Sequence, residues 1–183
     1  MHTILIANPK GGSGKTTLAT NVAGWLAGKR QRVAIDDRDP QQSSTQWLER
    51  RPALFPAIGL IDVDLRRKDA KALDLAWRVI DSPAGLHGDE LRESLKSADQ
   101  VLVPLTPSAY DMAATQRFLG VVAEAKSVKQ GNLPVGVVAM RVDARTQSAV
   151  ELDDFVASFD FPLIAHLRSL SARCARGSRE IAM

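Results

Sequence analysis

Short apolar runs alternate along this chain with longer segments in which apolar residues recur at helical spacing. The runs that predict buried strands cover residues 3–7, 32–35, 58–61, 78–80, 100–105 and 134–140, with a weaker run at 162–165. The segments that predict helices cover residues 15–27, 42–50, 65–75, 89–97, 110–129 and 147–158. Such alternation is typical of α/β proteins with a mostly parallel sheet and helices on both faces. Ligands of such sheets bind at the carboxyl ends of the strands.

A glycine-rich loop follows the first apolar run. It reads Asn8-Pro9-Lys10-Gly11-Gly12-Ser13-Gly14-Lys15-Thr16-Thr17 and leads directly into a predicted helix. Glycines let the backbone turn tightly and aim its N–H groups at a polyphosphate, and the helix N-terminus adds the positive end of its dipole. Lys15 is placed to reach the β- and γ-phosphates, and the Thr16 hydroxyl to bind Mg²⁺. The general G-x-x-x-x-G-K-[ST] pattern is met except at its first position, which is Pro9 here.

Carboxylates stand at the ends of two other predicted strands. Asp36, Asp37 and Asp39 follow the second run, and Asp81 closes the fourth. Carboxylates that face a phosphate loop are suited to binding Mg²⁺ and to orienting an attacking water. From the residues alone, the segment around Asp39 fits a turn and helix cap equally well, and Asp81 also fits a solvated strand end.

Four motifs, in order along residues 3–145, resemble the deviant Walker A ATPases of the ParA/MinD family, in particular small ParA partition proteins such as ParF. The loop at 10–16 matches K-G-G-x-G-K-[ST], residues 37–41 match D-x-D-P-Q, residues 81–85 match D-[ST]-P-x-G, and residues 103–108 resemble V-P-x-x-P-S. The resemblance implies a P-loop NTPase fold of the ParA/MinD type, hydrolysis of ATP to ADP and phosphate, and Mg²⁺ as a cofactor.

The same resemblance implies roles for individual residues. The first lysine of the loop, Lys10, is expected to cross to the nucleotide of a partner subunit, so that the ATP-bound form is a homodimer. Asp39 is expected to orient the attacking water, with Lys10 and Lys15 as the other catalytic residues. The expected metal site is Thr16, Asp37 and Asp81, and the expected nucleotide site is Lys10, Gly11, Gly12, Ser13, Gly14, Lys15, Thr16, Thr17 and Arg141. Asp36 departs from the motif, which usually has an apolar residue there.

The net charge of +3 is concentrated near the C-terminus. The last 21 residues hold four arginines against Glu180, which leaves 20 basic and 20 acidic residues elsewhere. Clustered arginines bind phosphate backbones by releasing counterions, although four charges on one chain bind DNA only weakly at physiological salt. A solvated face is the alternative. The candidate DNA-binding residues are Arg145, Arg168, Arg173, Arg176 and Arg179.

These features predict a ParA-like ATPase that dimerises on ATP, binds nonspecific DNA and positions a cargo such as a plasmid, a chromosome region or a carboxysome. A ParB-like or other cargo adaptor is expected to stimulate hydrolysis. No apolar run approaches 18 residues, and the N-terminus lacks the pattern of a signal peptide. We therefore expect a cytoplasmic protein that associates with the nucleoid when ATP is bound, with no membrane partner.

Residues 1–183 are expected to form a single domain whose short C-terminus lacks the family's usual last helix. Two other functions remain open. A MinD-like membrane switch needs a strongly amphipathic basic C-terminal helix, whereas residues 167–183 hold only scattered apolar side chains. A P-loop metabolic enzyme of the dethiobiotin synthetase type is the other, while iron–sulfur chemistry is excluded because Cys174 is the only cysteine. The tryptophans are expected to pack in the core or against helices: Trp25, Trp47 and Trp77.

Overall fold

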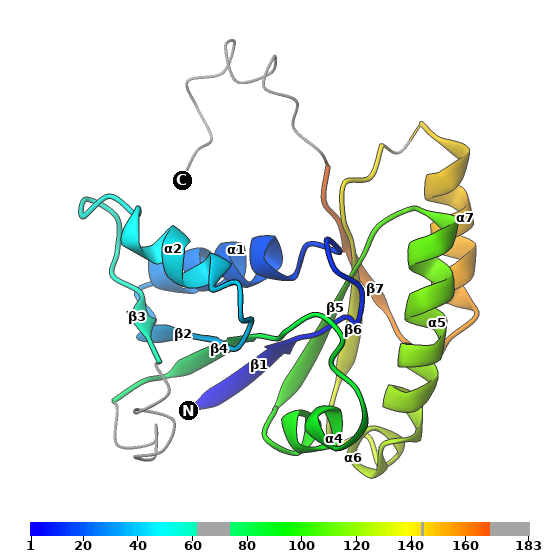
Figure 1. Cartoon of the computed structure of the whole chain (residues 1–183), viewed down its shortest axis with the longest axis horizontal. Coiled ribbons are helices and arrows are strands. Elements are labelled where there is room, and N and C mark those ends of the chain that lie inside the picture. The colour runs from blue at the N-terminus through cyan, green and yellow to red at the C-terminus, as the bar shows by residue number, and fades with distance from the viewer. Residues whose placement is uncertain (62–73, 144, 169–183) are drawn as a thin grey trace.

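A seven-stranded sheet forms the centre of the protein, and every neighbouring pair of its strands is parallel. The computed structural model describes residues 1–61, 74–143 and 145–168. Across the sheet the strand order is β3-β2-β4-β1-β5-β6-β7 (Figure 1). The strands are β1 (His2–Ile6), β2 (Val33–Asp37), β3 (Gly59–Leu60), β4 (Trp77–Asp81), β5 (Gln100–Leu105), β6 (Val135–Ala139) and β7 (Leu163–His166).

Helices lie between these strands, as the alternating pattern predicts. Those in the described ranges are α1 (Lys15–Gly28), α2 (Ser43–Glu49), α4 (Gly88–Lys96), α5 (Ala109–Glu124), α6 (Lys126–Lys129) and α7 (Gln147–Ala157). All seven predicted strands are confirmed, and the sheet is wholly parallel. The helix predicted at 65–75 falls almost entirely outside the described residues. In the described ranges, no helix is both long and apolar enough to cross a membrane.

The single helix predicted at 110–129 is wrong, because the chain breaks it at Ala125. That residue is extended, with φ −63° and ψ 132°, and it separates α5 from the short α6. No glycine or proline stands at the break, so helix propensity alone does not reveal it. The turn after α6 returns Leu133 to the core, where its N–H donates to the Ser127 carbonyl.

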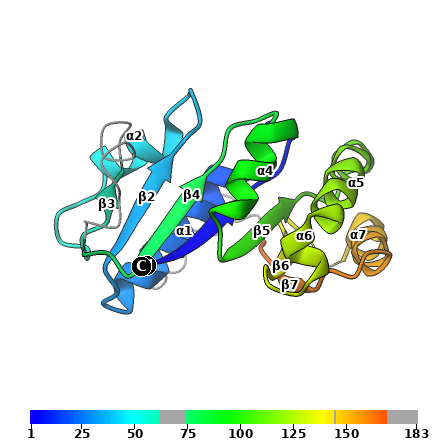
Figure 2. The ribbon, with the colours of Figure 1, turned by 90° about the horizontal axis from the view of Figure 1, so that it is seen from below.

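Each face of the sheet buries its own apolar core. On one face, α1 packs over Ile4, Ile6 and Ile35 of the central strands, with side chains of α2 at its edge. On the other face, α4 and α5 cover Leu5 and Ile80, and α7 covers the β6 side. Figures 1 and 2 show α1 and α4 on opposite sides of the sheet. Because central strands are buried on both faces, their alternate side chains are apolar in both directions.

The prediction for the tryptophans is confirmed for two of them and wrong for Trp25. Trp47 and Trp77 pack, partly buried, against the core beneath α1. Trp25 is 63% exposed on the outer side of α1, with the Lys29 ammonium 6.0 Å from its ring centroid. Apolar residues occur on several sides of α1, so spacing alone does not identify the side chain that faces solvent.

Truncation of Leu119 tests the core beneath α5. The side chain is fully buried, so Leu119→Ala should lower the free energy of unfolding by about 2–5 kcal/mol. Val121→Ala, on the same helix but 52% exposed, should change it by less than about 0.5 kcal/mol. Urea denaturation of both variants measures the difference, and equal losses would contradict this placement of α5.

Candidate functional site

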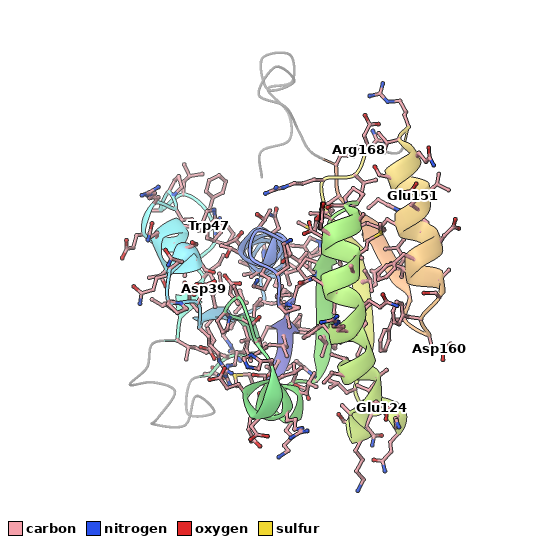
Figure 3. The ribbon with its side chains drawn as sticks, turned by 45° about the vertical axis from the view of Figure 1, so that its right-hand side comes forward. Asp39, Trp47, Glu124, Glu151, Asp160 and Arg168 are labelled. Atoms are coloured by element: carbon pink, nitrogen blue, oxygen red, sulfur yellow. The ribbon has the colours of Figure 1, made fainter. Side chains whose placement is uncertain are left out.

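Four segments meet at the carboxyl edge of the central strands. They are the loop after β1, the turn after β2, the end of β4 and the segment after β5. Asp37 and Asp81 are directly opposite one another on β2 and β4. Figure 3 shows Asp39 just below α2 on this turn, and Arg168 near the top of the view, after the end of β7. The sequence-predicted phosphate loop and carboxylates are therefore brought together, as parallel strands require.

Two glycines of the loop hold backbone conformations that other residues rarely adopt. Gly12 has φ +77° and Gly14 has φ +97°. A Cβ at position 14 would also lie 2.9 Å from the Cε of Met140, which follows β6. Gly11 has neither constraint, since its φ is not positive and nothing lies within 4 Å of its Cβ position. Only Gly12 and Gly14 are thus required by the shape of this loop.

Lys15 begins α1 with its charge largely removed from water. Its residue is 6% exposed, and its Nζ donates to the Lys10 carbonyl at 2.9 Å. Burial lowers the pKa of Lys15, although the negative charges of Asp81 and Asp39 act in the opposite direction. The Lys15 side chain is therefore held across the loop by the backbone carbonyl of Lys10, near the two carboxylates. Thr17, two residues later, is exposed.

Asp81 is more deeply buried than Asp37, the carboxylate opposite it on β2. It is fully buried, and its Oδ2 accepts a hydrogen bond from the Ser44 hydroxyl at the start of α2. The Thr16 hydroxyl also bonds to this carboxylate. Burial raises the pKa of Asp81, and the charges of Asp37 and Asp39 add to that shift while the two hydroxyls oppose it.

Three buried oxygens of the site have no hydrogen-bond partner in the part of the chain that is described: Asp81 Oδ1, Ser13 Oγ and Ser82 Oγ. Buried polar atoms normally have partners, so these atoms fit a ligand that supplies them. No three His, Cys, Asp or Glu side chains of the described residues gather to hold a metal alone. Mg²⁺ typically uses one or two carboxylates, waters and substrate phosphates, and Asp81 with the Thr16 hydroxyl fits that donor set.

Asp37 is engaged by its own turn. Its Oδ1 accepts the Asp39 N–H at 3.1 Å, and its Oδ2 accepts the N–H and hydroxyl of Thr45, both at 2.9 Å. The Asp39 carboxylate in turn accepts the Gln41 N–H at 2.9 Å. Asp37 thus fixes Asp39 relative to α2. Its predicted place in the metal shell stays a prediction, as does the water-orienting role of Asp39.

Lys10 is tied to its own chain in this structure. Its Nζ lies 3.0 Å from Asp111 Oδ1 on α5, and its side chain is 40% exposed. The Thr106 hydroxyl also donates to Asp111. Burial would raise the pKa of Asp111, but the hydrogen bonds from Thr106 and Lys10, with the charges of Lys10 and Arg141, lower it. The sequence did not predict Asp111 as the partner of Lys10.

Sequence reasoning also missed Asn8, the first residue of the loop. It is fully buried, and its Nδ2 donates to the Pro104 carbonyl at 2.8 Å and to the Thr115 hydroxyl at 3.0 Å. Its Oδ1 accepts the Lys10 N–H at 2.8 Å. Asn8 therefore joins the loop to β5 and α5. Its position two residues before the lysine-glycine motif is the only signal that the sequence offers.

The predicted DNA-binding arginines are only partly described. Arg145 is exposed and forms a two-pronged ion pair with Asp143, through Nε at 2.9 Å and Nη2 at 2.8 Å. These bonds lower the pKa of Asp143 to about 2, and the nearby charge of Arg168 contributes. Arg141, a residue of the predicted nucleotide site, is exposed with φ +56°. The remaining three, Arg173, Arg176 and Arg179, lie outside the described residues.

Replacing Asp81 by Asn should stabilise the nucleotide-free protein at neutral pH. A carboxyl whose pKa is raised by folding stabilises the folded state when it is protonated. That contribution to the free energy of unfolding is lost as the pH rises from the ordinary pKa of 3.8 through the pKa in the folded state. Asp81→Asn removes this loss, so its free energy of unfolding should exceed that of the wild type at pH 7.5, with the difference shrinking toward pH 4.

Urea denaturation across this pH range is the measurement. The matched control is Asp160→Asn, at an exposed position, which should follow the wild type. A neutral-pH loss of stability in Asp81→Asn would show that hydrogen bonding to the charged form outweighs the burial of Asp81.

Comparison with known proteins identifies the family. The model of the CobQ/CobB/MinD/ParA nucleotide binding domain matches residues 4–172. The chain is 34% identical to the maintenance of carboxysome distribution protein A of Gloeobacter kilaueensis over 78% of its own length, but spans only 64% of that relative. It is 29% identical to the chromosome-partitioning ATPase Soj of Thermus thermophilus, covering 82% of this chain and 73% of Soj.

A solved structure supports the same fold. The cobyrinic acid a,c-diamide synthase of Mycobacterium smegmatis, with bound ADP and magnesium, superposes with a TM-score of 0.72 at 22% identity over 90% of this chain and 85% of that one. The family model covers most of the chain and includes the phosphate loop, the carboxylates and, apart from the first two residues of β1, the seven strands. This chain therefore belongs to the CobQ/CobB/MinD/ParA family of nucleotide-binding domains, as a ParA/MinD-type P-loop protein.

Proposed function

We propose that this protein is a ParA-type ATPase that forms a homodimer with ATP, binds nonspecific DNA as that dimer, and positions a cargo. A cargo-bound adaptor protein stimulates hydrolysis and releases the dimer from DNA. The observation that carries the proposal is the meeting of Lys15, Asp81 and Asp39 at one sheet edge, with a second lysine, Lys10, at the mouth of the same loop. The relatives named for chromosome partitioning and carboxysome distribution supply the class of cargo.

The chemistry is in-line attack of water on the γ-phosphate, with charge stabilisation as the main task of the protein. Lys15 exchanges the Lys10 carbonyl for phosphate oxygens, which compensates for its burial. Asp39 orients the attacking water. Asp81 and the Thr16 hydroxyl would hold Mg²⁺, which would supply positive charge to the triphosphate when bound.

Lys10 acts after it leaves Asp111. The ion pair between them is half-exposed on the Lys10 side, so water screens it and opening it costs little. A partner's triphosphate is a stronger counter-charge than one carboxylate. In the proposed dimer, each Lys10 therefore turns from its own α5 to the nucleotide of the other subunit, and adds to the charge stabilisation there.

DNA binding in this proposal depends on two basic patches, one on each protomer, that each bind DNA weakly. Arg145 and Arg168 both act on Asp143, so one protomer presents a partly neutralised basic surface. Dimerisation doubles that surface, and the two patches bind one duplex with avidity. The protein is then cytoplasmic with ADP and associated with the nucleoid with ATP.

Retention on a nonspecific DNA column tests the function. Binding should require ATP, be absent with ADP or no nucleotide, and fall at least tenfold between 50 and 200 mM salt, on the order expected when several phosphates are contacted. Lys15→Ala should bind neither nucleotide nor DNA. Retention that is the same with and without ATP, or absent in every state, would contradict the proposal.

Lys10→Ala tests the crossing of the subunit boundary. ATP affinity should remain within about twofold of the wild type, while ATP-dependent dimers are lost and turnover falls about 10³-fold, the scale of a cation supplied in trans. Analytical ultracentrifugation and a phosphate-release assay measure the two effects. Lys96→Ala, at an exposed position on α4, is the control and should behave as the wild type. If Lys10→Ala still forms normal ATP-dependent dimers, Lys10 does not contact the nucleotide of the partner subunit.

A further inference from the structure

A buried ion-pair cluster lies directly behind the turn that carries Asp39. Asp36 is fully buried at the end of β2, and its Oδ2 accepts hydrogen bonds from Arg38 Nε at 3.1 Å and Arg78 Nε at 3.0 Å. Arg78, on β4, also donates through its Nη2. The arginine side chains are 27% and 14% exposed respectively. We call these three residues the Asp36 cluster.

Strand alternation separates this cluster from the nucleotide. Neighbouring side chains on a strand point to opposite faces, so Asp36 and Arg38 share one side of β2, and Asp37 and Asp39 the other. The Arg38 N–H donates to the Asp81 carbonyl at 3.0 Å, which continues the ladder between β2 and β4 past the end of β2. Both the backbone and the guanidinium of Arg38 are therefore engaged.

Stability alone does not account for the cluster. Burying charges costs free energy that their attraction often fails to offset, and apolar residues of similar size are frequently as stable or more so. Position 36 is also where the motif that this turn resembles usually has an apolar residue. In some proteins a buried ionic group specifies one geometry that apolar packing leaves open, and the contacts of this cluster favour such an orienting role.

We propose that the Asp36 cluster positions the turn between β2 and α2, and that Arg38 is the positioning residue through which it sets the place of Asp39. Asp36 accepts a hydrogen bond from the Arg38 guanidinium, and Asp37 accepts one from the Asp39 N–H, so both residues of the turn are fixed to the end of β2. This inference rests on the proposed ATPase function only for its effect on turnover. The fixing of the turn itself is a property of the nucleotide-free chain.

Two variants remove the link between Arg38 and Asp36 without leaving the Asp36 carboxylate unpaired. Arg38→Leu keeps the backbone bond to Asp81 and the pair of Asp36 with Arg78. The double variant Asp36→Ile/Arg78→Ile replaces the buried pair by apolar side chains, which should leave the unfolding midpoint in urea at or above the wild-type value. Arg92→Gln, in an exposed ion pair on α4, is the control.

Hydrogen exchange in the nucleotide-free protein measures the positioning directly. Amides in residues 38–46 should exchange at least about fivefold faster in Arg38→Leu and in the double variant, with α4 and α5 unchanged. Arg92→Gln should match the wild type. Unchanged exchange in both variants would overturn the proposal, whatever the activity of the wild type.

Turnover separates a positioning residue from a merely structural one. Both variants should bind a nonhydrolysable ATP analogue within about twofold of the wild type but hydrolyse ATP about tenfold more slowly, because misplacement of the water-orienting group affects kcat. Arg38→Lys should restore part of the rate, and Arg38→Leu added to the double variant should cause no further loss. Additive losses, or full turnover in Arg38→Leu, would refute the role of Arg38. Absence of turnover in the wild type would instead refute the ATPase function and leave hydrogen exchange to decide the positioning.

Discussion

Opposite charges held out of water at one edge of the sheet are the constraint on which the rest of the structure depends. Lys15 and Asp81 are both buried. Burial lowers the pKa of Lys15 and raises that of Asp81, so it favours the neutral form of each side chain. Charges in such a place are tolerated only when partners and a rigid frame surround them. The apolar cores on the two faces supply that frame, and the hydroxyls of Thr16 and Ser44 supply part of the hydrogen bonding.

The turn after β2 shows how the same site is joined to its surroundings. Asp37 fixes the turn to the start of α2 through Thr45, and Ser44 on the same helix reaches Asp81. The loop after β1 is joined in the other direction, through Asn8 to β5 and α5. A ligand that moves either segment therefore displaces a helix on one side of the site, which is the usual way in which small shifts at a ligand become large ones elsewhere.

Local patterns predicted the frame well and the long-range contacts poorly. The bounds of β5 follow from its continuous apolar run, and the loop at 10–16 follows from its glycines and lysines. The bonds of Asn8 to Pro104 and Thr115, and the pairing of Lys10 with Asp111, join segments that only the strand order brings together. No local periodicity encodes such contacts. The break at Ala125 was missed for a related reason, since the turn that it begins is stabilised by the distant core around Leu133.

The place of β1 in the sheet has a consequence for how the chain folds. It is the earliest strand in the sequence but the central one in the sheet, where it pairs with β4 and β5. The first of those partners begins only at Trp77, so β1 has no neighbour while the intervening segment is being made. Folding dominated by such distant pairings is slow and leaves apolar strands exposed. The phosphate loop, which follows β1 directly, therefore has its strand fixed in the sheet only once β4 has been made.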